Sequence, residues 1–308
     1  MAKIATREAY GAALAELIQI KDNIVVLDAD LAGSTKSGMA GKVCPDRHFN
    51  MGIAEANMMS VAAGLAASNK TVFASSFAMF ATGRAFEQIR NSICYPAANV
   101  KICASHAGIT VGEDGASHQT IEDISIMRSL PNMVVVHPCD AVQTTHMVRE
   151  ITHLVGPCYM RLGRLAVDPV YEEGETFELG KGKVIQEGSK IAIITCGLMV
   201  QETLKAREAM DFKPTIVDMH TIKPIDVDLI KKLAATHDMI VTIEEHSIIG
   251  GLGSAVAEVV VEECPIRMWR IGLNDEFGTS GTPAELLAHF GLDAEHIAAE
   301  VNRLYKTL

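Results

Sequence analysis

Short, nearly continuous apolar segments alternate with helical stretches along most of the chain, and this alternation constrains the fold most strongly. Strands that are apolar on both faces must be covered on both faces, as in parallel sheets whose strands are connected by helices. We therefore predict an α/β fold. The strands predicted in the first part are 23–27, 71–74, 100–103, 133–136 and 158–161, and the helices are 6–19, 54–68, 77–93, 121–129 and 140–153.

The alternation is interrupted at 168–189, a stretch rich in glycine and charge with few long apolar side chains. We interpret it as a linker between a first domain at 1–167 and a smaller α/β domain at 190–308. In the second domain we predict strands at 191–195, 215–218, 239–243 and 266–271, and helices near 199–210, 226–235, 250–263 and 294–306.

Composition narrows the class of protein. Of 308 residues, 48% are hydrophobic, which excludes a disordered chain. The 38 acidic and 27 basic residues give a net charge of -11, which argues against nucleic acid or an anionic membrane as the main partner. There is no signal-peptide pattern and no apolar run long enough for a membrane span. The seven cysteines are scattered and form no C-x-x-C pair, so we expect neither disulfide bonds nor a zinc site. Reduced thiols are typical of a cytoplasmic protein, which is the location we expect.

The stretch 104–120, ASHAGITVGEDGASHQT, follows a predicted strand and concentrates titratable side chains. His106, Glu113, Asp114 and His118 lie within thirteen residues of one another, among three glycines. Loops beyond the carboxyl ends of parallel strands are where α/β folds bind ligands. The alternative is a flexible surface loop with incidental charges.

Glu55 begins a helix that is otherwise rich in small and apolar residues. Two interpretations remain open. The carboxylate could simply be favoured in the first turn by the helix dipole. It could instead be buried, with a raised pKa, and exchange a proton with a ligand nitrogen.

Two further groups of side chains are candidates for ligand contacts. Phe77 and Phe80 are three residues apart and share one helical face, a pattern more typical of a core than of a stacking platform. Arginine forms bidentate hydrogen bonds with anions, although most exposed arginines are only solvated. The arginines considered for an anion site are Arg7, Arg84, Arg161 and Arg164.

Two other motifs do not support a site. The glycine-rich stretch 248–256 lacks the third glycine of a dinucleotide-binding turn, because Val256 stands in its place. His220, His237 and His246 lack the spacing of metal ligands and are interpreted as core or interface histidines.

Taken together, these segments resemble the transketolase family of thiamine diphosphate enzymes over essentially the whole chain. The matching stretches occur in the family's order. They are KIATREA at 3–9, DADLAGS at 28–34, GIAEANM at 52–58, SFAMF at 76–80, SHAGITVGEDGASHQ at 105–119, LPNMVVVHPCD at 130–140, GPCYMRLGR at 156–164, VTIEEHSIIGGLGSAVAE and GTSGTPAELLAHFGL. The resemblance implies a pyrimidine-binding domain with a parallel sheet, followed by a transketolase C-terminal domain.

The resemblance also implies how the cofactor is held. Glu55 matches the glutamate that hydrogen-bonds the aminopyrimidine ring and drives deprotonation of the thiazolium carbon. Phe80 matches the ring that stacks on the pyrimidine, with Phe77 beside it. Asp30 lies at a matched position on the cofactor side.

For the substrate, His106 and His118 match histidines that face the carbonyl and hydroxyls, and Asp114 matches an aspartate that contacts a hydroxyl. The implied phosphate cluster consists of Arg7, Ser34, His106 and Arg164. The implied reaction transfers a two-carbon ketol unit from a ketose phosphate such as xylulose 5-phosphate to an aldose phosphate such as ribose 5-phosphate, as in the pentose phosphate pathway.

The chain departs from the family pattern at two points. Gly83 stands where an aromatic residue is expected, so the pyrimidine pocket is either looser or filled from elsewhere. The Gly-Asp-Gly motif with which the family holds Mg²⁺ and the cofactor diphosphate is absent, and no metal ligand is predicted in this chain. We expect a separate N-terminal transketolase subunit to supply that site, in a heterotetramer of two chains of each kind.

Two alternatives keep part of this interpretation. One is a half-enzyme similar to 1-deoxyxylulose-phosphate synthase, with pyruvate as donor, or one acting on another sugar phosphate. The other is a degenerate transketolase-like module without activity. The presence of Glu55, Asp114, His106 and His118 argues against the second.

Overall fold

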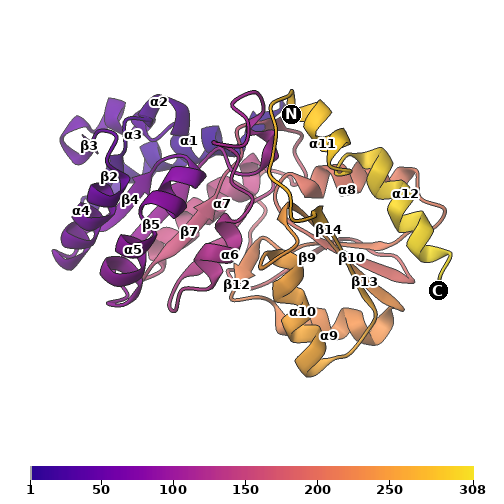
Figure 1. Ribbon diagram of the computed structural model, residues 1–308. Coiled ribbons are helices and arrows are strands. Elements are labelled where there is room, and N and C mark those ends of the chain that lie inside the picture. Colours follow the sequence, from indigo (N-terminus) through magenta and orange to yellow (C-terminus); the bar gives the residue numbers. More distant parts are fainter. Residues whose placement is uncertain (1) are drawn as a thin grey trace.

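The computed structural model describes residues 2–308 as two α/β domains, each built on a mainly parallel sheet (Figure 1). The first sheet has the strand order β12-β6-β7-β5-β4-β2-β3, and only β12 is antiparallel to its neighbour. Its strands are β2 (Ile24–Asp28), β3 (His48–Asn50), β4 (Thr71–Ser75), β5 (Val100–Ala104), β6 (Val134–Val136), β7 (Cys158–Arg161) and β12 (Thr221–Lys223).

Helices cover both faces of this sheet, as the apolar strands require. In β2, Val25 and Leu27 pack into one core cluster, whereas Ile24 and Val26 pack into another on the opposite face. The helices of the first domain are α1 (Thr6–Ile20), α2 (Ala32–Thr35), α3 (Gly38–Val43), α4 (Glu55–Ala67), α5 (Phe86–Gln88), α6 (Asp123–Arg128) and α7 (Ala141–His153). Helices α1 and α7 pack together on one face, and α4 and α6 contribute to the core on the other.

The second sheet has the order β14-β13-β10-β11-β9, with β9 antiparallel at one edge. Its strands are β9 (Lys183–Gln186), β10 (Ile191–Thr195), β11 (Thr215–Asp218), β13 (Met239–Ser247) and β14 (Met268–Leu273). Helices α9 (Val227–Thr236) and α10 (Leu252–Glu263) pack together, and so do α8 (Met199–Glu208) and α12 (Ala294–Tyr305), while α11 (Pro283–His289) lies near the first domain (Figure 1). The predicted two-domain α/β fold is confirmed.

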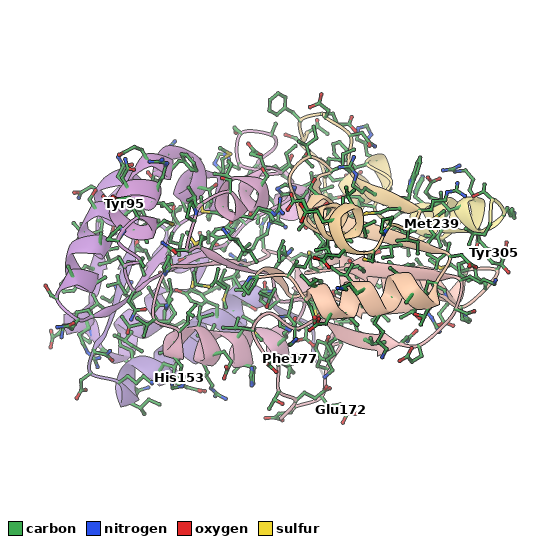
Figure 2. The ribbon with its side chains drawn as sticks, turned by 90° about the horizontal axis from the view of Figure 1, so that it is seen from below. Tyr95, His153, Glu172, Phe177, Met239 and Tyr305 are labelled. Carbon is green, nitrogen blue, oxygen red and sulfur yellow. The ribbon has the colours of Figure 1, made fainter. Side chains whose placement is uncertain are left out.

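The segment predicted as a linker is partly built into the fold. Within 168–189, strand β9 pairs with β11, and Phe177 is buried against Tyr171, His146 and His220. Figure 2 shows Phe177 between the two halves of the molecule. The composition of 168–189 did not indicate strand β9, because the strand is short and only half-buried at the sheet edge. We therefore propose that the second domain begins before Lys183.

The two domains are not fully separate along the chain, because a strand from the second part of the sequence belongs to the first sheet. Strand β12 lies after β11 in the sequence, yet it pairs with β6 of the first sheet.

The predicted long helix 77–93 is not a regular α-helix, because π-helical turns at Phe80–Arg84 and Ile89–Cys94 flank the short α5. Within residues 2–308, every helix is too short or too polar to cross a membrane.

Candidate active site at the edge of the first sheet

The carboxyl ends of four neighbouring strands bring the candidate residues to one edge of the first sheet. Asp30 follows β2, Phe77 follows β4, His106 follows β5, and Arg164 follows β7. These strands are adjacent in the order β7-β5-β4-β2, so residues far apart in sequence become neighbours. Arg7 reaches the same edge from the first turn of α1 and contacts His106.

Glu55 is the first residue of α4, and its side chain is buried, with 3% of the residue exposed. Its Oε1 lies 3.5 Å from Nη1 of Arg84. The first-turn position, which the helix-dipole interpretation requires, favours a negative charge there. The burial that the second interpretation requires is also present, and Arg84 links the carboxylate to the Phe80 ring.

Four rings, those of Phe77, Phe80, His106 and His118, form an aromatic cluster in this part of the site. The Phe77 ring stacks on His106 with centroids 3.8 Å apart, and on Phe80 at 5.9 Å. His118 meets the Phe80 ring edge-on at 5.2 Å. Phe77 is buried and Phe80 is only half-buried. The pair therefore joins the core through Phe77 and reaches the site through Phe80.

Arg84 connects the aromatic cluster to Glu55. Its guanidinium carbon lies 4.3 Å from the centre of the Phe80 ring while Nη1 reaches toward Glu55. A planar, N–H-donating group therefore already contacts the ring and the carboxylate together. Arg84 is consequently a partner of Glu55, which differs from the anion-binding role considered for it from the sequence.

The position of Gly83 is filled from the preceding turn. A Cβ atom placed on Gly83 would lie 2.7 Å from the terminal methyl of Met79. The methionine side chain thus occupies the space where a residue-83 side chain would begin.

Arg7, Ser34 and His106 form a polar group next to the aromatic cluster. Nη1 of Arg7 donates to the backbone carbonyl of Ser34 at 2.7 Å and lies 3.4 Å from Nε2 of His106. The other ring nitrogen of His106 lies 2.8 Å from Oγ of Ser105. Burial, together with the positive charges of Arg7 and Arg164, lowers the pKa of His106 to about 3. The imidazole is therefore neutral at physiological pH.

We expect the ring resonances of His106 not to titrate between pH 5 and 8. The folded state binds this proton only at much lower pH, because the charged imidazole would be buried beside two guanidinium groups. Proton NMR of the histidine rings, assigned with a His106→Asn variant, measures this directly. Titration of His106 near pH 6.5 would contradict the buried, neutral state.

The loop that carries Asp114 and His118 reaches back to Arg164. Nη1 of Arg164 donates to Oε2 of Glu113 at 3.1 Å and also to the carbonyl of Val111. Asp114 is exposed on this loop, and His118 is half-buried against the two phenylalanine rings. The loop thus brings His118 to the phenylalanine rings and Glu113 to Arg164.

Asp30 is held by a residue that the sequence analysis missed. Its backbone N–H donates to Oδ1 of Asn50 at 3.1 Å, and the Asn50 amide donates back to Oδ1 of Asp30 at 3.0 Å. Asp30 has a φ of 63°, so this pair stabilises an uncommon backbone conformation. Asn50 lies at the end of β3, where the adjacent GIAEANM match gave no hint of the role.

Arg161 proves unsuitable for an external anion, which corrects the earlier expectation. Its side chain is 1% exposed, and Nε donates to Oδ2 of Asp123 at 2.8 Å. Arg161 lies within β7, whereas Arg164 follows the strand and emerges at its edge. Across residues 2–308, no group of three or more His, Cys, Asp or Glu side chains is arranged to hold a metal ion.

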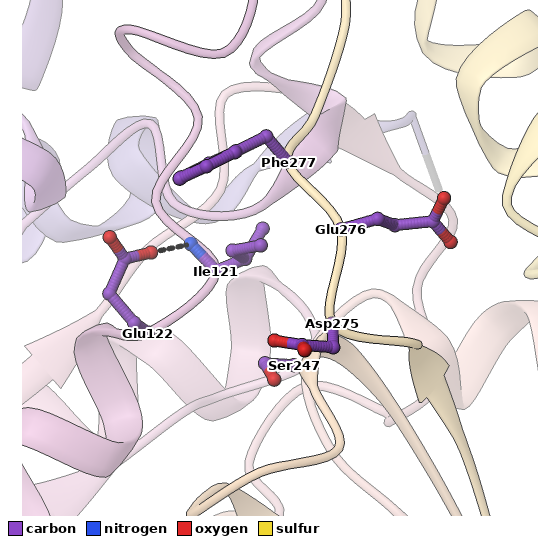
Figure 3. Close-up of a pocket in the computed structure, with 6 residues that line it drawn as sticks. All are labelled: Ile121, Glu122, Ser247, Asp275, Glu276 and Phe277. Carbon is purple, nitrogen blue, oxygen red and sulfur yellow. Dashed lines mark hydrogen bonds between the residues drawn. The ribbon is translucent and has the colours of Figure 1, made fainter.

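A separate cleft of about 240 Å³ opens between the domains (Figure 3). Three carboxylate side chains and the exposed Phe277 are among its lining residues, and the candidate site residues do not line it. Because its lining is acidic, it does not suit a phosphorylated substrate. The lining residues are Ile121, Glu122, Ser247, Asp275, Glu276 and Phe277.

Comparisons with known proteins agree with this architecture. The family model described as the transketolase pyrimidine-binding domain matches residues 2–169, and the one described as the transketolase C-terminal domain matches residues 180–297. A transketolase C-terminal section of Methanocaldococcus jannaschii is 52% identical over 301 residues, which cover 96% of this chain and 94% of that protein.

Two further similarities describe relatives of the same size. A 6-deoxy-6-sulfo-D-fructose transketolase subunit of a Clostridium species is 39% identical over 294 residues, 94% of this chain and 91% of that protein. A solved structure described as a split-gene transketolase, an inactive β4 tetramer, has a TM-score of 0.91 at 52% identity and covers 98% of this chain and 99% of its own. By contrast, the chain spans about half the length of the mammalian transketolases that it matches.

Proposed function

The chain belongs to the transketolase family through both of its domains, and from that membership we propose that it is the C-terminal subunit of a split transketolase. The observation that carries the proposal is the meeting of two arrangements at one sheet edge. In the first arrangement Arg84 joins Glu55 to the Phe80 ring. In the second, the charges of Arg7 and Arg164 act on His106. Two relatives support the split, because the archaeal section and the chain described as a split-gene transketolase are matched over 94% and 99% of their lengths.

The residues at this edge fit the aminopyrimidine ring of thiamine diphosphate. Phe80 and Glu55 already contact one planar N–H donor, the Arg84 guanidinium, and an aminopyrimidine offers the same combination of flat face and N–H groups. Bound thiamine diphosphate supplies the carbon nucleophile and the electron sink for cleaving a ketose. In our proposal Glu55 holds a proton at the ring nitrogen, Phe77 and Phe80 orient the ring, and Asp30 lies on the cofactor side.

The substrate's anionic end meets the cationic part of the site. Arg7 and Arg164 both lie close enough to His106 to depress its pKa, so their charges act on the same small volume. This volume suits the phosphate of a ketose or aldose phosphate, with Ser34 beside Arg7. His118 and Asp114 then contact the substrate's hydroxyls, and the neutral His106 exchanges hydrogen bonds with its oxygens.

A sulfonated sugar is a second candidate substrate. The Clostridium relative is described as a subunit that acts with 6-deoxy-6-sulfo-D-fructose, and a sulfonate is a tetrahedral anion like a phosphate. Guanidinium groups bind both anions through the same donors. A pyruvate-dependent reaction similar to that of 1-deoxyxylulose-phosphate synthase remains an alternative that the same assay distinguishes.

We also propose the assembly and the place of action. A separate N-terminal subunit would supply the Mg²⁺ ligands and the diphosphate site, since a diphosphate needs a hard cation held by oxygen ligands, and the proposed roles of this chain include no such ligands. Two copies of each subunit would form a heterotetramer, and the solved split-gene relative is itself described as an inactive β4 tetramer. The seven free cysteines suit a reducing cytoplasm.

The proposal is tested by titrating thiamine diphosphate with Mg²⁺ into this chain alone and then into its mixture with a candidate N-terminal subunit. We expect little binding to the chain alone, and tight binding and ketol transfer by the mixture. Parallel assays with xylulose 5-phosphate, the sulfonated ketose and pyruvate as donors separate the three substrate classes. Full cofactor binding and activity in this chain alone would overturn the split-enzyme proposal.

Replacing Arg164 by alanine is expected to raise KM for a sugar phosphate about 10- to 100-fold while changing kcat less. The lost hydrogen bond is charge-assisted, and such bonds contribute about 1.5–3 kcal/mol. The matched substrate is an unphosphorylated ketose, for which KM should hardly change. An equal rise for both substrates would show that Arg164 acts on the loop, through Val111 and Glu113, rather than on the phosphate.

A further inference from the structure

The loop that carries His106, Asp114 and His118, which we call the site loop (105–120), is attached to the second domain. Oε1 of Glu245, in strand β13, accepts a hydrogen bond from the backbone N–H of Thr110 at 2.6 Å. At the other end of the loop, the Gln119 amide donates to the carbonyl of Thr279 at 2.9 Å. The second domain therefore holds the loop from two sides, although it contributes none of the candidate site residues.

Close packing accompanies the contact between Glu245 and the loop. Gly108 has a φ of +80°, and a Cβ atom placed on it would lie 2.3 Å from the Glu245 carboxyl group. The backbone of the loop can therefore approach the carboxylate only because residue 108 is glycine. Gly115, near the other end of the loop, approaches Ser280 in the same way.

Glu245 is itself anchored to the first domain. It is 4% exposed, and its backbone carbonyl accepts from Nη2 of Arg161 at 3.0 Å, while Arg161 is ion-paired with the buried Asp123. Its main chain thus binds the end of β7, and its side chain binds the site loop. Burial raises the pKa of Glu245, and the charge of Arg161 and the Thr110 N–H partly offset that effect.

The preceding residue provides an internal comparison. Glu244 is equally buried, but neighbouring side chains of a strand point to opposite faces. Its two carboxylate oxygens accept from the backbone N–H groups of Leu252 and Gly253, at 2.7 and 2.8 Å, at the start of α10. Glu244 therefore stabilises a helix within its own domain, whereas Glu245 reaches out to the site loop.

We propose that Glu245 is a positioning residue through which the second domain sets the conformation of the site loop and thereby the affinity for the sugar substrate. The kinetic part of this inference rests on the proposed function, whereas the structural part does not. Removing the carboxylate should free the Thr110 N–H and loosen the loop around His106, Asp114 and His118. Glu55 and Phe80, which we propose to contact the cofactor, lie on α4 and the Phe80–Arg84 turn rather than on the loop, so we expect cofactor affinity to change less than KM for the sugar.

The experiment compares Glu245→Ala, Glu245→Gln and Glu245→Asp with the matched variant Glu244→Gln. Amide hydrogen exchange across 105–120 is measured on the full chain, and KM and kcat are measured with the partner subunit. For Glu245→Ala we expect about tenfold faster exchange of the loop amides and about a tenfold higher KM, with a smaller change in cofactor affinity. Glu245→Gln keeps an acceptor oxygen and should restore most of both, while Glu244→Gln should leave the loop unaffected.

The outcomes are decisive in each direction. Unchanged loop exchange in Glu245→Ala, or equal loosening of the loop in Glu244→Gln, would overturn the proposal. If Glu245→Ala does not fold, Glu245→Asp decides, because it keeps the charge but shortens the reach toward Thr110. A complete lack of ketol transfer in the unsubstituted complex would overturn the proposed function and leave the exchange result on Glu245 standing.

Discussion

Replacing Glu55 by glutamine is expected to lower kcat by about 10²–10⁴-fold, the usual effect of removing a proton-transfer group. Glutamine keeps the size of the side chain and its position at the start of α4, but it cannot exchange a proton with a ring nitrogen. The buried position of Glu55 makes rescue by solvent inefficient. The measurement is steady-state kinetics of the complex with saturating cofactor, together with calorimetric cofactor affinity.

The control is the same substitution at Glu87, an exposed residue on the neighbouring α5 that contacts Gln88 and Asn91. Glu87→Gln should leave kcat unchanged. Full activity in Glu55→Gln would mean that the carboxylate only stabilises the first turn of α4. It would also favour the alternative of a transketolase-like module without catalytic function in this chain.

Replacing Asp123 by alanine is expected to lower the free energy of unfolding by about 3–5 kcal/mol, because it leaves a buried guanidinium without its counter-ion. Oδ2 of Asp123 accepts from Nε of Arg161 at 2.8 Å and from the Tyr159 hydroxyl at 2.6 Å, and both ionic side chains are almost fully buried. Urea denaturation followed by circular dichroism measures the loss. The double variant Asp123→Leu with Arg161→Met should recover much of it, since no charge is then left unpaired.

An exposed ion pair in the same chain provides the control. Lys190 and Asp238 are also close, at 3.0 Å, but both side chains are about half exposed, so Asp238→Asn should cost less than about 1 kcal/mol. A loss as small as this in Asp123→Ala would contradict a structural role for the buried pair.

The effect of Asp123 also has a defined pH dependence. Burial alone would raise the pKa of Asp123, but Arg161, His246 and Tyr159 outweigh burial and hold the pKa below its usual value. A carboxyl group with a lowered folded-state pKa stabilises the protein above its unfolded-state pKa of about 4 and loses that contribution at lower pH. The difference between the unsubstituted protein and Asp123→Ala should therefore shrink as the pH falls below about 4.

Much of the architecture was predictable because burial is encoded locally. Strands β10 and β11 have the predicted bounds, Ile191–Thr195 and Thr215–Asp218, since each contains β-branched apolar residues and ends at a polar residue. Strands β3, β9 and β12 were not predicted. Each is short and lies at a sheet edge, where a strand needs few apolar residues and its pairing partner is set by the rest of the fold.

The sequence by itself determined the two α/β domains, the edge of the sheet at which the candidate site lies, and the residues that could form it. The domains and the sheet edge follow from apolar periodicity and from the strand ends that precede each polar segment. The roles of the candidate residues were implied by the resemblance to the transketolase family, which alone indicated Asp30 and Ser34. Only the tertiary structure decided which partner each charged side chain contacts. Arg84 contacts Glu55, Asp123 contacts Arg161, and Glu245 accepts a hydrogen bond from the Thr110 N–H. Such pairs join residues that are 29 to 135 positions apart, and their energies depend on burial that only the packed chain creates.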